Sequence, residues 1–275
     1  MDTLRRDELS VVVMNLDLPD LLSLCESSKE LKNKVCNNPN VWYNKLDKDY
    51  PEYKELDLSF LSHPSFLSPS PKEMYVFMYQ LDYIKKLLNT KETLKDIFLR
   101  KGLDLSNKKL KKIPAFNLPN LKILYLSDNH LTEVPNFDNL PNLQTLSLTN
   151  NKLTEVPNFN LPNLQTLYLF NNELTEVPNF NLPSLQTLYL EDNKLTEVPN
   201  FNLPSLQELY LFNNQLTKVP NFNLPSLQTL FLSNNRLTQV PNFNLPSLQT
   251  LFLSNNRLTE ESKEEIKKRY KFTRL

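Results

Sequence analysis

The 275-residue sequence has a single glycine, Gly102, and only two histidines and two cysteines. One glycine cannot supply a glycine-rich phosphate loop or a Gly-x-Ser-x-Gly nucleophile elbow, because each motif needs more than one. A zinc site needs about four ligands at suitable spacing. His63, His130, Cys25 and Cys36 show no recognisable ligand spacing. We therefore expect a protein that is not an enzyme, with no catalytic residue, metal or cofactor.

An excess of charge of one sign is also missing, since 31 basic side chains balance 31 acidic ones. A general binder of nucleic acid or of membrane surfaces needs a basic excess, so we expect neither kind of partner. No apolar stretch approaches the ~20 residues of a membrane helix, and the N-terminus shows no secretory signal. Two cysteines suit a reducing compartment, which predicts an intracellular protein, cytoplasmic or nuclear, with both thiols reduced.

The sequence contains many copies of one internal repeat. One copy, from Leu164, reads LQTLYLFNNELTEVPNFNLPS. A degenerate copy from Leu103 precedes the array, and the final copy stops after Leu258. The other copies follow a first step of 22 residues and then steps of 21, beginning at Leu121, Leu143, Leu164, Leu185, Leu206, Leu227 and Leu248.

Each unit alternates leucines with polar or aromatic residues, which is the period of a short strand with one buried face. The rest of the unit contains two prolines, so the return segment is predicted to be extended rather than helical. A lone unit buries too little apolar surface to fold, whereas stacked units bury one another's faces. A phenylalanine in each return segment would form a continuous aromatic spine inside the stack.

An asparagine recurs between the buried leucines of each copy. A buried amide without hydrogen bonds would be costly, so we expect each one to bond the turn of the neighbouring coil. Lys108 stands at this place in the first copy, where we expect an irregular rung. The predicted structural ladder comprises Asn129, Asn151, Asn172, Asn193, Asn214, Asn235 and Asn256.

The pattern LxxLxLxxNxL followed by a proline-rich segment resembles the leucine-rich repeat family in its short form with a non-helical return. The resemblance implies a curved solenoid with a parallel sheet on its concave face. We therefore expect an α+β repeat protein with an N-terminal helical domain and a C-terminal capping helix. The expected boundaries are 1–47 for an F-box-like domain, 48–101 for a helical linker or cap, 102–258 for eight repeats, and 259–275 for the capping helix.

Helix-start signals dominate the N-terminal segment. Ser27 to Glu30 and Ser70 to Glu73 both read as capping boxes, and Asn38-Pro39 precedes a helix that contains Trp42. A last helix is predicted to end at Gly102, with the glycine as its left-handed terminator.

The run from Leu16 to Leu46 resembles an F-box. Leu16-Asp17, Asp20-Leu21-Leu22 and Val41-Trp42 match the Leu-Asp, Asp-Leu-Leu and Leu-Trp of that family, while Arg5 stands where proline is usual. The resemblance implies docking on a Skp-type adaptor of a cullin ubiquitin ligase. We expect Leu16, Leu22 and Val35 in the internal core, and Leu18 and Pro19 exposed for contact. The full set of implied adaptor contacts is Leu4, Leu16, Leu18, Pro19, Leu21, Leu22, Val41 and Trp42.

Outward strand positions of the repeats define a candidate partner surface, because exposed aromatics and arginines are typical of protein-binding hot spots. The alternative is that the aromatics favour strands and stack on one another without binding anything. The candidate residues are Tyr125, Tyr168, Phe170, Tyr189, Tyr210, Phe212, Phe231, Phe252, Arg236 and Arg257.

Two functions stay open on these grounds. One is the substrate receptor of a Skp–cullin–F-box ligase, which binds an unknown protein on the repeats. The other is a free-standing binding or scaffold protein whose N-terminal helices only cap the first coil. An F-box joined to such repeats resembles proteins of amoebal giant viruses and of amoebae. If the protein is viral, we expect it inside a host cell.

Overall fold

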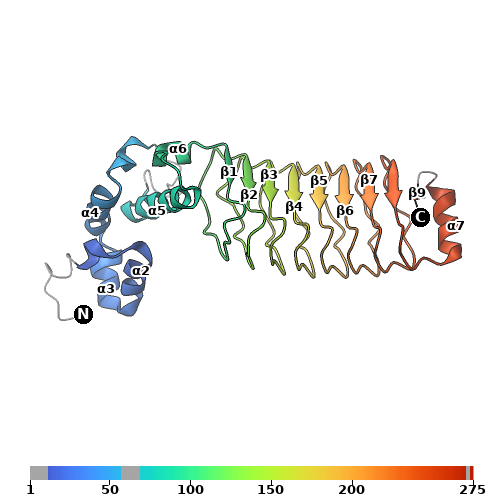
Figure 1. Cartoon of the computed structure of the whole chain (residues 1–275), viewed down its shortest axis with the longest axis horizontal. Helices are drawn as coiled ribbons and strands as arrows, with labels where there is room; N and C mark the ends of the chain where they lie inside the picture. Colours follow the sequence, from blue (N-terminus) through green and yellow to red (C-terminus); the bar gives the residue numbers. More distant parts are fainter. Residues whose placement is uncertain (1–11, 57–68, 271–272, 275) are drawn as a thin grey trace. The chain divides into compact units, whose positions relative to one another are not determined.

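The computed structural model describes residues 12–56, 69–270 and 273–274. The chain divides into two compact units, residues 1–98 and 99–275 (Figure 1). The first unit is helical, and the second unit is a stack of coils with one strand in each coil.

The helical unit follows the predicted pattern of short amphipathic helices. Residues 12–15 are helical. The later elements are α2 (Leu18–Ser27), α3 (Lys29–Leu31), a π-helical turn η1 (Lys32–Cys36), α4 (Pro39–Asp49), a 3₁₀ turn η2 (Pro51–Glu55), α5 (Pro71–Leu88) and α6 (Leu94–Phe98).

The helix starts agree with the sequence signals at two places and differ at one. Ser70 and Glu73 form the predicted reciprocal capping box of α5, and Asn38 caps α4. The predicted box from Ser27 to Glu30 is wrong by one residue. Ser28 accepts the hydrogen bond from the Leu31 amide at 3.1 Å, while the Ser27 hydroxyl donates to Leu24 within α2.

Gly102 does not terminate a helix. Helix α6 ends at Phe98, and Gly102 begins the first strand without a positive φ. A Cβ atom built at Gly102 would meet nothing within 4 Å, so neither the backbone nor the surroundings demand a glycine there. The left-handed residue at a helix end is Asn89, with φ of 50° after α5.

The two cysteines are joined rather than reduced. Cys25 at the end of α2 and Cys36 at the end of η1 form a disulfide, with 6.0 Å between their Cα atoms. A sequence separation of 11 residues does not by itself predict this disulfide. The pairing depends on how the π-helical turn packs against α2. The prediction of two free thiols is therefore wrong. The two cysteines no longer support a reducing compartment.

The second unit contains the predicted parallel sheet. Its strands hydrogen-bond in chain order from β1 to β9, and every pair is parallel (Figure 1). The strands are β1 (Gly102–Asp104), β2 (Ile123–Tyr125), β3 (Thr145–Ser147), β4 (Thr166–Tyr168), β5 (Thr187–Tyr189), β6 (Glu208–Tyr210), β7 (Thr229–Phe231), β8 (Thr250–Phe252) and β9 (Thr273–Arg274).

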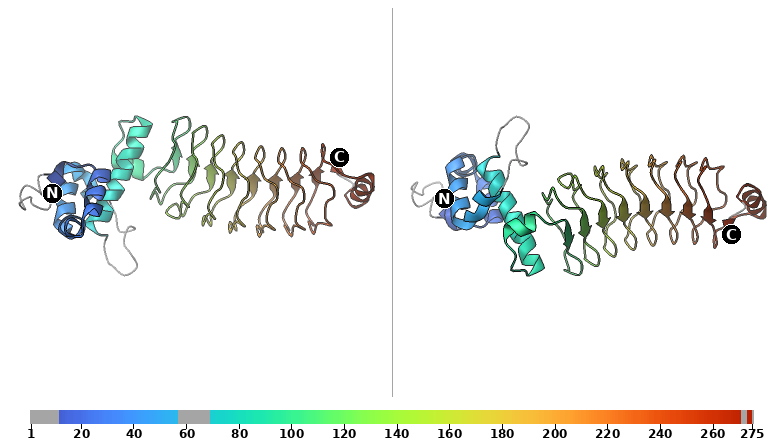
Figure 2. Two further views of the ribbon diagram at one scale, coloured as in Figure 1. Left: turned by 90° about the horizontal axis from the view of Figure 1, so that it is seen from below. Right: turned by 90° about the horizontal axis from the view of Figure 1, so that it is seen from above.

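The interior of the stack is formed by the repeating leucines and phenylalanines. Leu167 and Leu169 are fully buried, as are their counterparts in the neighbouring coils. Figure 2 shows the coils of this unit stacked one after another. Rings of the buried phenylalanine spine, from Phe137 to Phe243, follow one another at 5.9–6.4 Å between centroids. On the sheet face the aromatic rings from Tyr168 to Phe252 are only 4.4–4.6 Å apart. Coils that are closer at the sheet than at the spine curve the array, with the sheet on its concave side.

The recurring asparagine of each coil satisfies the backbone of two coils. Asn193 donates to the carbonyls of Leu169, Leu190 and Glu191 at 3.0–3.1 Å. Its Oδ1 accepts from the Leu174 amide of the preceding coil at 3.0 Å. The equivalent bonds are made around Asn129, Asn151, Asn172, Asn214, Asn235 and Asn256.

The first coil, in which lysine replaces the asparagine, is irregular as expected. Asn129 of the next coil accepts from the amides of both Lys108 and Leu110 at 3.0 Å. Asn107 and Lys109 adopt positive φ angles of 59° and 55°.

The residue before each ladder asparagine lies in the left-handed region, with φ between 53° and 57° at all but the first coil. Asparagine and aspartate tolerate this region better than other side-chain-bearing residues, so the repeats need no glycine there. The side chains of these residues also form an exposed second ladder. The side-chain amide of Asn171 donates to Oδ1 of Asn150, and the side-chain amide of Asn150 donates to Oδ1 of Asp128. A new run starts at Asp192, because a carboxylate can accept the bond from Asn213 but has no proton to donate to Asn171.

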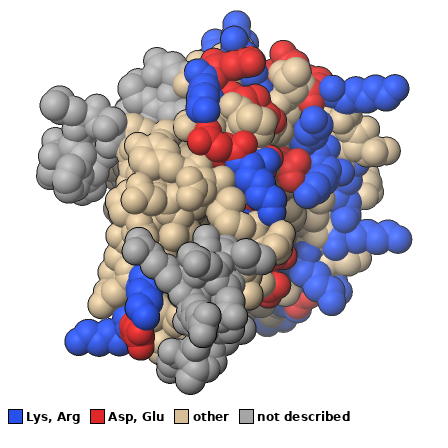
Figure 3. All heavy atoms as spheres, turned by 90° about the vertical axis from the view of Figure 1, so that its left-hand side faces the viewer, with Lys and Arg blue, Asp and Glu red and all other residues tan. Residues whose placement is uncertain are grey.

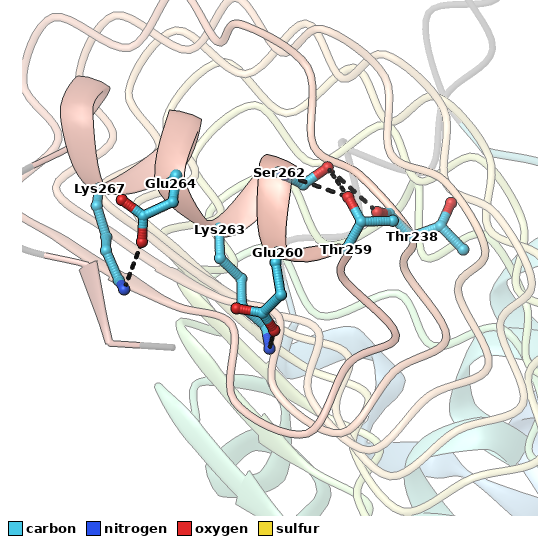
Figure 4. A network of polar contacts seen from close by, with 7 residues as sticks. All are labelled: Thr238, Thr259, Glu260, Ser262, Lys263, Glu264 and Lys267. Atoms are coloured by element: carbon cyan, nitrogen blue, oxygen red, sulfur yellow. Dashed lines mark hydrogen bonds and ion pairs between the residues drawn. The ribbon is translucent and has the colours of Figure 1, made fainter.

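The C-terminal helix α7 (Glu260–Arg269) covers the last coil (Figure 4). Thr259 caps it by accepting from the Ser262 amide at 3.2 Å, and the Ser262 hydroxyl reaches the Thr238 carbonyl at 3.5 Å. Ile266 and Tyr270, four residues apart, are both buried. The helix is shorter than the expected 259–275, because Thr273 and Arg274 add strand β9 beside β8.

Candidate binding face

The outward residues of the strands form an ordered aromatic column. Neighbouring rings in it are nearly parallel, at 4–19° between planes. We call this set the aromatic column: Tyr168, Tyr189, Tyr210, Phe231 and Phe252. Each ring is half-buried by its neighbours, and the inward residue between the outward ones is fully buried in every strand from β4 to β8. The column is therefore rigid and accessible on one side.

The column is interrupted near the N-terminal end of the sheet. Ser147 of β3 is buried and shares a hydrogen bond of 2.7 Å with the Ser127 hydroxyl. Tyr125 lies beyond this break and is 39% exposed, which makes it one of the most exposed large apolar side chains. At the other end the column is extended by Arg274, whose guanidinium lies 5.3 Å from the Phe252 ring centroid. Sequence reasoning missed Arg274, because it treated the C-terminal segment only as a cap.

A second row of outward residues runs beside the column. Phe170 meets the rings of Tyr168 and Tyr189 edge-on at 6.5 Å, and Phe212 meets Phe231 at 6.3 Å. Glu191 occupies the position between these two phenylalanines and is buried. Burial raises the pKa of Glu191 from its usual value to about 7, and the adjacent Asp192 adds to the increase.

A third row of outward residues carries mostly charged side chains, and its exposed members include Glu173, Lys194, Arg236 and Arg257. Arg236 and Arg257 are exposed, as predicted for partner contacts. Lys194 forms an ion pair with Glu173 of the preceding coil at 2.9 Å, and this pair lowers the pKa of Glu173.

Two tyrosines of the column, Tyr189 and Tyr210, have phenol pKa values above the usual range. Burial raises the pKa of Tyr210, and so does its hydroxyl's donation to Glu208 at 2.8 Å. Burial likewise raises the pKa of Tyr189. Both phenols therefore stay protonated near neutral pH, and their hydroxyls remain donors at the edge of the column.

The implied adaptor contacts are scattered between core and surface. Leu18, Leu21 and Trp42 are buried, and the Trp42 indole donates to the Cys36 carbonyl at 3.0 Å. Leu16, Leu22 and Val41 are half-buried, Pro19 is exposed, and Leu4 lies outside the described residues. The expectations of an exposed Leu18 and of core positions for Leu16 and Leu22 are not met, whereas Val35 is buried as expected.

A buried lysine in the helical unit also escaped sequence reasoning. Lys45 is 1% exposed, donates to the Leu16 carbonyl at 2.7 Å and pairs with Asp49 at 3.0 Å. Asp49 also accepts from the Tyr75 hydroxyl at 2.8 Å. This network fixes the loop before α2 against α4 and α5, and no periodic signal in the sequence could have marked it.

Figure 3 shows the chain from the left-hand side of Figure 1, where the helices of the first unit are drawn. On this face lysines and arginines lie beside aspartates and glutamates.

Within residues 12–56, 69–270 and 273–274 there is no group of three or more His, Cys, Asp and Glu side chains able to hold a metal ion. Among the helices that the structure describes, none has both the length and the apolar character to cross a bilayer.

A family model for leucine-rich repeats matches residues 101–139, 119–161, 141–182, 183–224 and 225–263. These matches span more than half of the chain, so the chain belongs to the leucine-rich repeat family. Solenoids of this kind are interaction scaffolds that present an extended concave surface to protein partners. The match begins at residue 101 and leaves the F-box-like segment outside it.

Three solved structures illustrate the similarity. YopM from Yersinia enterocolitica WA-314 is 29% identical with a TM-score of 0.54, over 65% of this chain and 42% of that one. InlP from Listeria monocytogenes is 31% identical with a TM-score of 0.54, over 64% of this chain and 63% of that one. A Shigella effector LRR domain shares the fold at 23% identity and a TM-score of 0.53, over 80% and 90%.

The chain thus spans less than two thirds of the length of YopM and of InlP. No curated protein matches the sequence.

Proposed function

We propose that this leucine-rich repeat protein binds a protein partner on its concave sheet face, with the aromatic column at the centre of the contact. The observation that supports this function best is the column itself, five stacked rings that are accessible on one side. Stacking holds each ring in place before binding, so little side-chain entropy is lost when a partner docks. Half-exposed aromatics flanked by arginines are the composition of binding hot spots.

The dimensions of the column suit a protein rather than a small ligand. Strands lie about 4.8 Å apart, so the column from β4 to β8 is about 19 Å long. The rings form a ridge beside the second row and the mostly charged third row. A partner with a matching extended apolar strip would cover this ridge.

Affinity capture with the full chain tests the binding role. The double variant Tyr189→Ser and Tyr210→Ser removes two central rings and introduces the residue that occupies the equivalent position of β3, Ser147. The control is Asn200→Ser, an exposed position on the return segment. The proposal predicts proteins that the wild type and N200S retain and the double variant loses. Equal recovery by all three chains would contradict it.

We further propose that the helical unit docks on a Skp-type adaptor, which would make the protein a substrate receptor of a cullin ubiquitin ligase. Support comes from the F-box-like order of residues between Leu16 and Trp42 and from the apolar side chains that remain accessible there. Pro19 is exposed, and Leu16, Leu22 and Val41 are half-exposed. Leu21 and Trp42 belong to the unit's own core, so changing them would test folding instead of docking.

A purified Skp-type adaptor provides the direct test. The variant Pro19→Glu with Leu22→Glu places two charges on the accessible side of α2, and Asn44→Glu is the control on exposed surface of α4. Binding by wild type and N44E, lost in the double variant, supports the receptor function. If the wild type does not bind the adaptor, the free-standing scaffold becomes the better description.

The proposed location inside a cell, or inside a host cell if the protein is viral, needs its own test. Disulfides such as Cys25–Cys36 persist mainly in oxidising compartments. Both cysteines are buried in the folded unit. Acid quenching of intact cells, followed by thiol alkylation of the denatured chain, therefore distinguishes the two states. Alkylated Cys25 and Cys36 support a reducing, intracellular location, and protected cysteines contradict it.

A further inference from the structure

One repeat differs from the others in the row beside the aromatic column. At this position the other copies have a hydroxyl or a phenyl ring, whereas the copy of β5 has the carboxylate of Glu191. Glu191 is 8% exposed, and its Oε2 atom has no hydrogen-bond partner within the described chain. A buried acceptor without a partner is rare in folded proteins and costs stability, so it calls for an explanation.

Aromatic rings border this carboxylate on both neighbouring coils. The backbone amide of Asn171 donates to the backbone carbonyl of Glu191 at 3.2 Å. The backbone amide of Asp192 donates to the backbone carbonyl of Phe212, also at 3.2 Å. The parallel register therefore continues past the strands and places Phe170 and Phe212 on either side of Glu191. Tyr189, two residues earlier on the same coil, adds a third ring, which Phe170 meets edge-on. Ring faces attract cations, and a carboxylate among them attracts cations further.

The neighbouring acids of the sheet face are already partnered. Glu208 accepts from the Tyr210 hydroxyl at 2.8 Å, and Glu173 pairs with Lys194 at 2.9 Å. Lys194 is the basic side chain nearest in sequence to Glu191, and this ion pair occupies it. Glu191 thus differs from these two carboxylates in having a buried oxygen that no donor within the described residues reaches.

We propose that Glu191, between Phe170 and Phe212, receives a basic side chain, lysine or arginine, of the protein that binds the sheet face. The inference rests on the proposed function and specifies the chemistry of the partner at one point of the contact. The aliphatic stem of the basic side chain would pack against the phenyl rings. Its charged end would meet Oε2, which is enclosed in the free chain, once the side chains around Glu191 move aside. A partner that supplies the missing donor removes the cost of the unsatisfied acceptor, which makes the contact selective for a cation.

Carboxyl titration by NMR tests the cation preference without any knowledge of the partner. The full chain, labelled with ¹³C at glutamate carboxyls, is titrated with methylguanidinium and methylammonium, and with neutral N-methylacetamide as the matched control. Both cations should lower the Glu191 pKa by about one unit in a saturable way, and the neutral amide should not. A shift at Glu191 no larger than at exposed Glu176 would overturn the proposal.

A second measurement separates this inference from the proposed function. Glu191→Ser introduces the residue found at this place in four other copies, Ser106, Ser127, Ser233 and Ser254. With a partner captured by the wild type, E191S should weaken binding about tenfold, while the aromatic double variant abolishes it. If E191S binds as tightly as wild type and the double variant does not bind, the sheet face is confirmed as the binding surface and the cation site is refuted.

Discussion

At the residue scale, each regular coil uses two consecutive polar residues for two different tasks. In the pair Asn171-Asn172, the first adopts the left-handed conformation on the surface and the second is buried and bonds two coils together. The buried task was predictable, because a polar residue that recurs between buried leucines needs backbone partners. The surface task was not predicted, although the scarcity of glycine together with repeated Asn-Asn and Asp-Asn pairs is a signal that could have revealed it.

The inner ladder gives a direct stability prediction. Asn193→Ala should lower the free energy of unfolding by about 1–3 kcal/mol, because it leaves the Leu174 amide without its partner and removes one of the two side-chain donors to the Leu169 carbonyl. Lys194→Ala should cost less than about 1 kcal/mol, since its ion pair with Glu173 is about half exposed. Urea unfolding of both variants measures the difference. Equal midpoints would contradict the role of the ladder.

Glu191 gives a prediction about pH. Its pKa is raised from 4.5 to about 7 in the folded chain, chiefly because burial disfavours the charge. The folded state therefore binds this proton more tightly than the unfolded state, so the stability is fully present below pH 4.5 and falls as the pH rises through about 7.

Thermal unfolding from pH 4 to pH 8 tests this sign. Relative to Glu191→Gln, the wild type should lose on the order of 1–3 kcal/mol across that range. Glu176→Gln, at an exposed position, serves as the control and should run parallel to the wild type. A wild type that parallels E191Q at every pH would show that Glu191 is not buried as a charged group.

At the element scale, the sequence predicted the strands of the repeats and the extended returns correctly, because the period of two and the prolines leave little choice. Helix starts were found where a capping residue stands alone, as at Ser70, and misplaced by one residue where Ser27 and Ser28 compete. Strand β9 and the Cys25–Cys36 bond were missed, since both depend on contacts between segments that share no sequence pattern.

The capping helix α7 gives a prediction at this scale. Ile266→Ala should destabilise the last coil by about 2–4 kcal/mol, because Ile266 is 2% exposed against the end of the stack. Hydrogen exchange should accelerate for the amides of β8 and much less for those of β4, since coils interact mainly with their neighbours. Lys267→Ala, at an exposed position of the same helix, should leave both unchanged. Uniform acceleration in all strands would contradict a local capping role.

At the scale of the whole molecule, the sequence predicted the repeat architecture but only part of the candidate sites. The aromatic column follows from the repeat register, so its position on the sheet face could be read from alternation alone. The orientation of Leu16, Leu18 and Leu22 could not, because a short helix among several others can bury more than one of its faces. The same limit applies to Lys45, whose burial depends on Asp49 and on the Leu16 carbonyl.

The proposed function requires that the aromatic column contacts the protein partner. Site-specific photocrosslinking measures this contact directly, with a benzophenone side chain placed at Tyr189 in one chain and at Asn200, on the return segment, in another. We expect a discrete crosslinked protein from position 189 that is absent from position 200. Crosslinks from position 200 alone, or the same products from both positions, would contradict it.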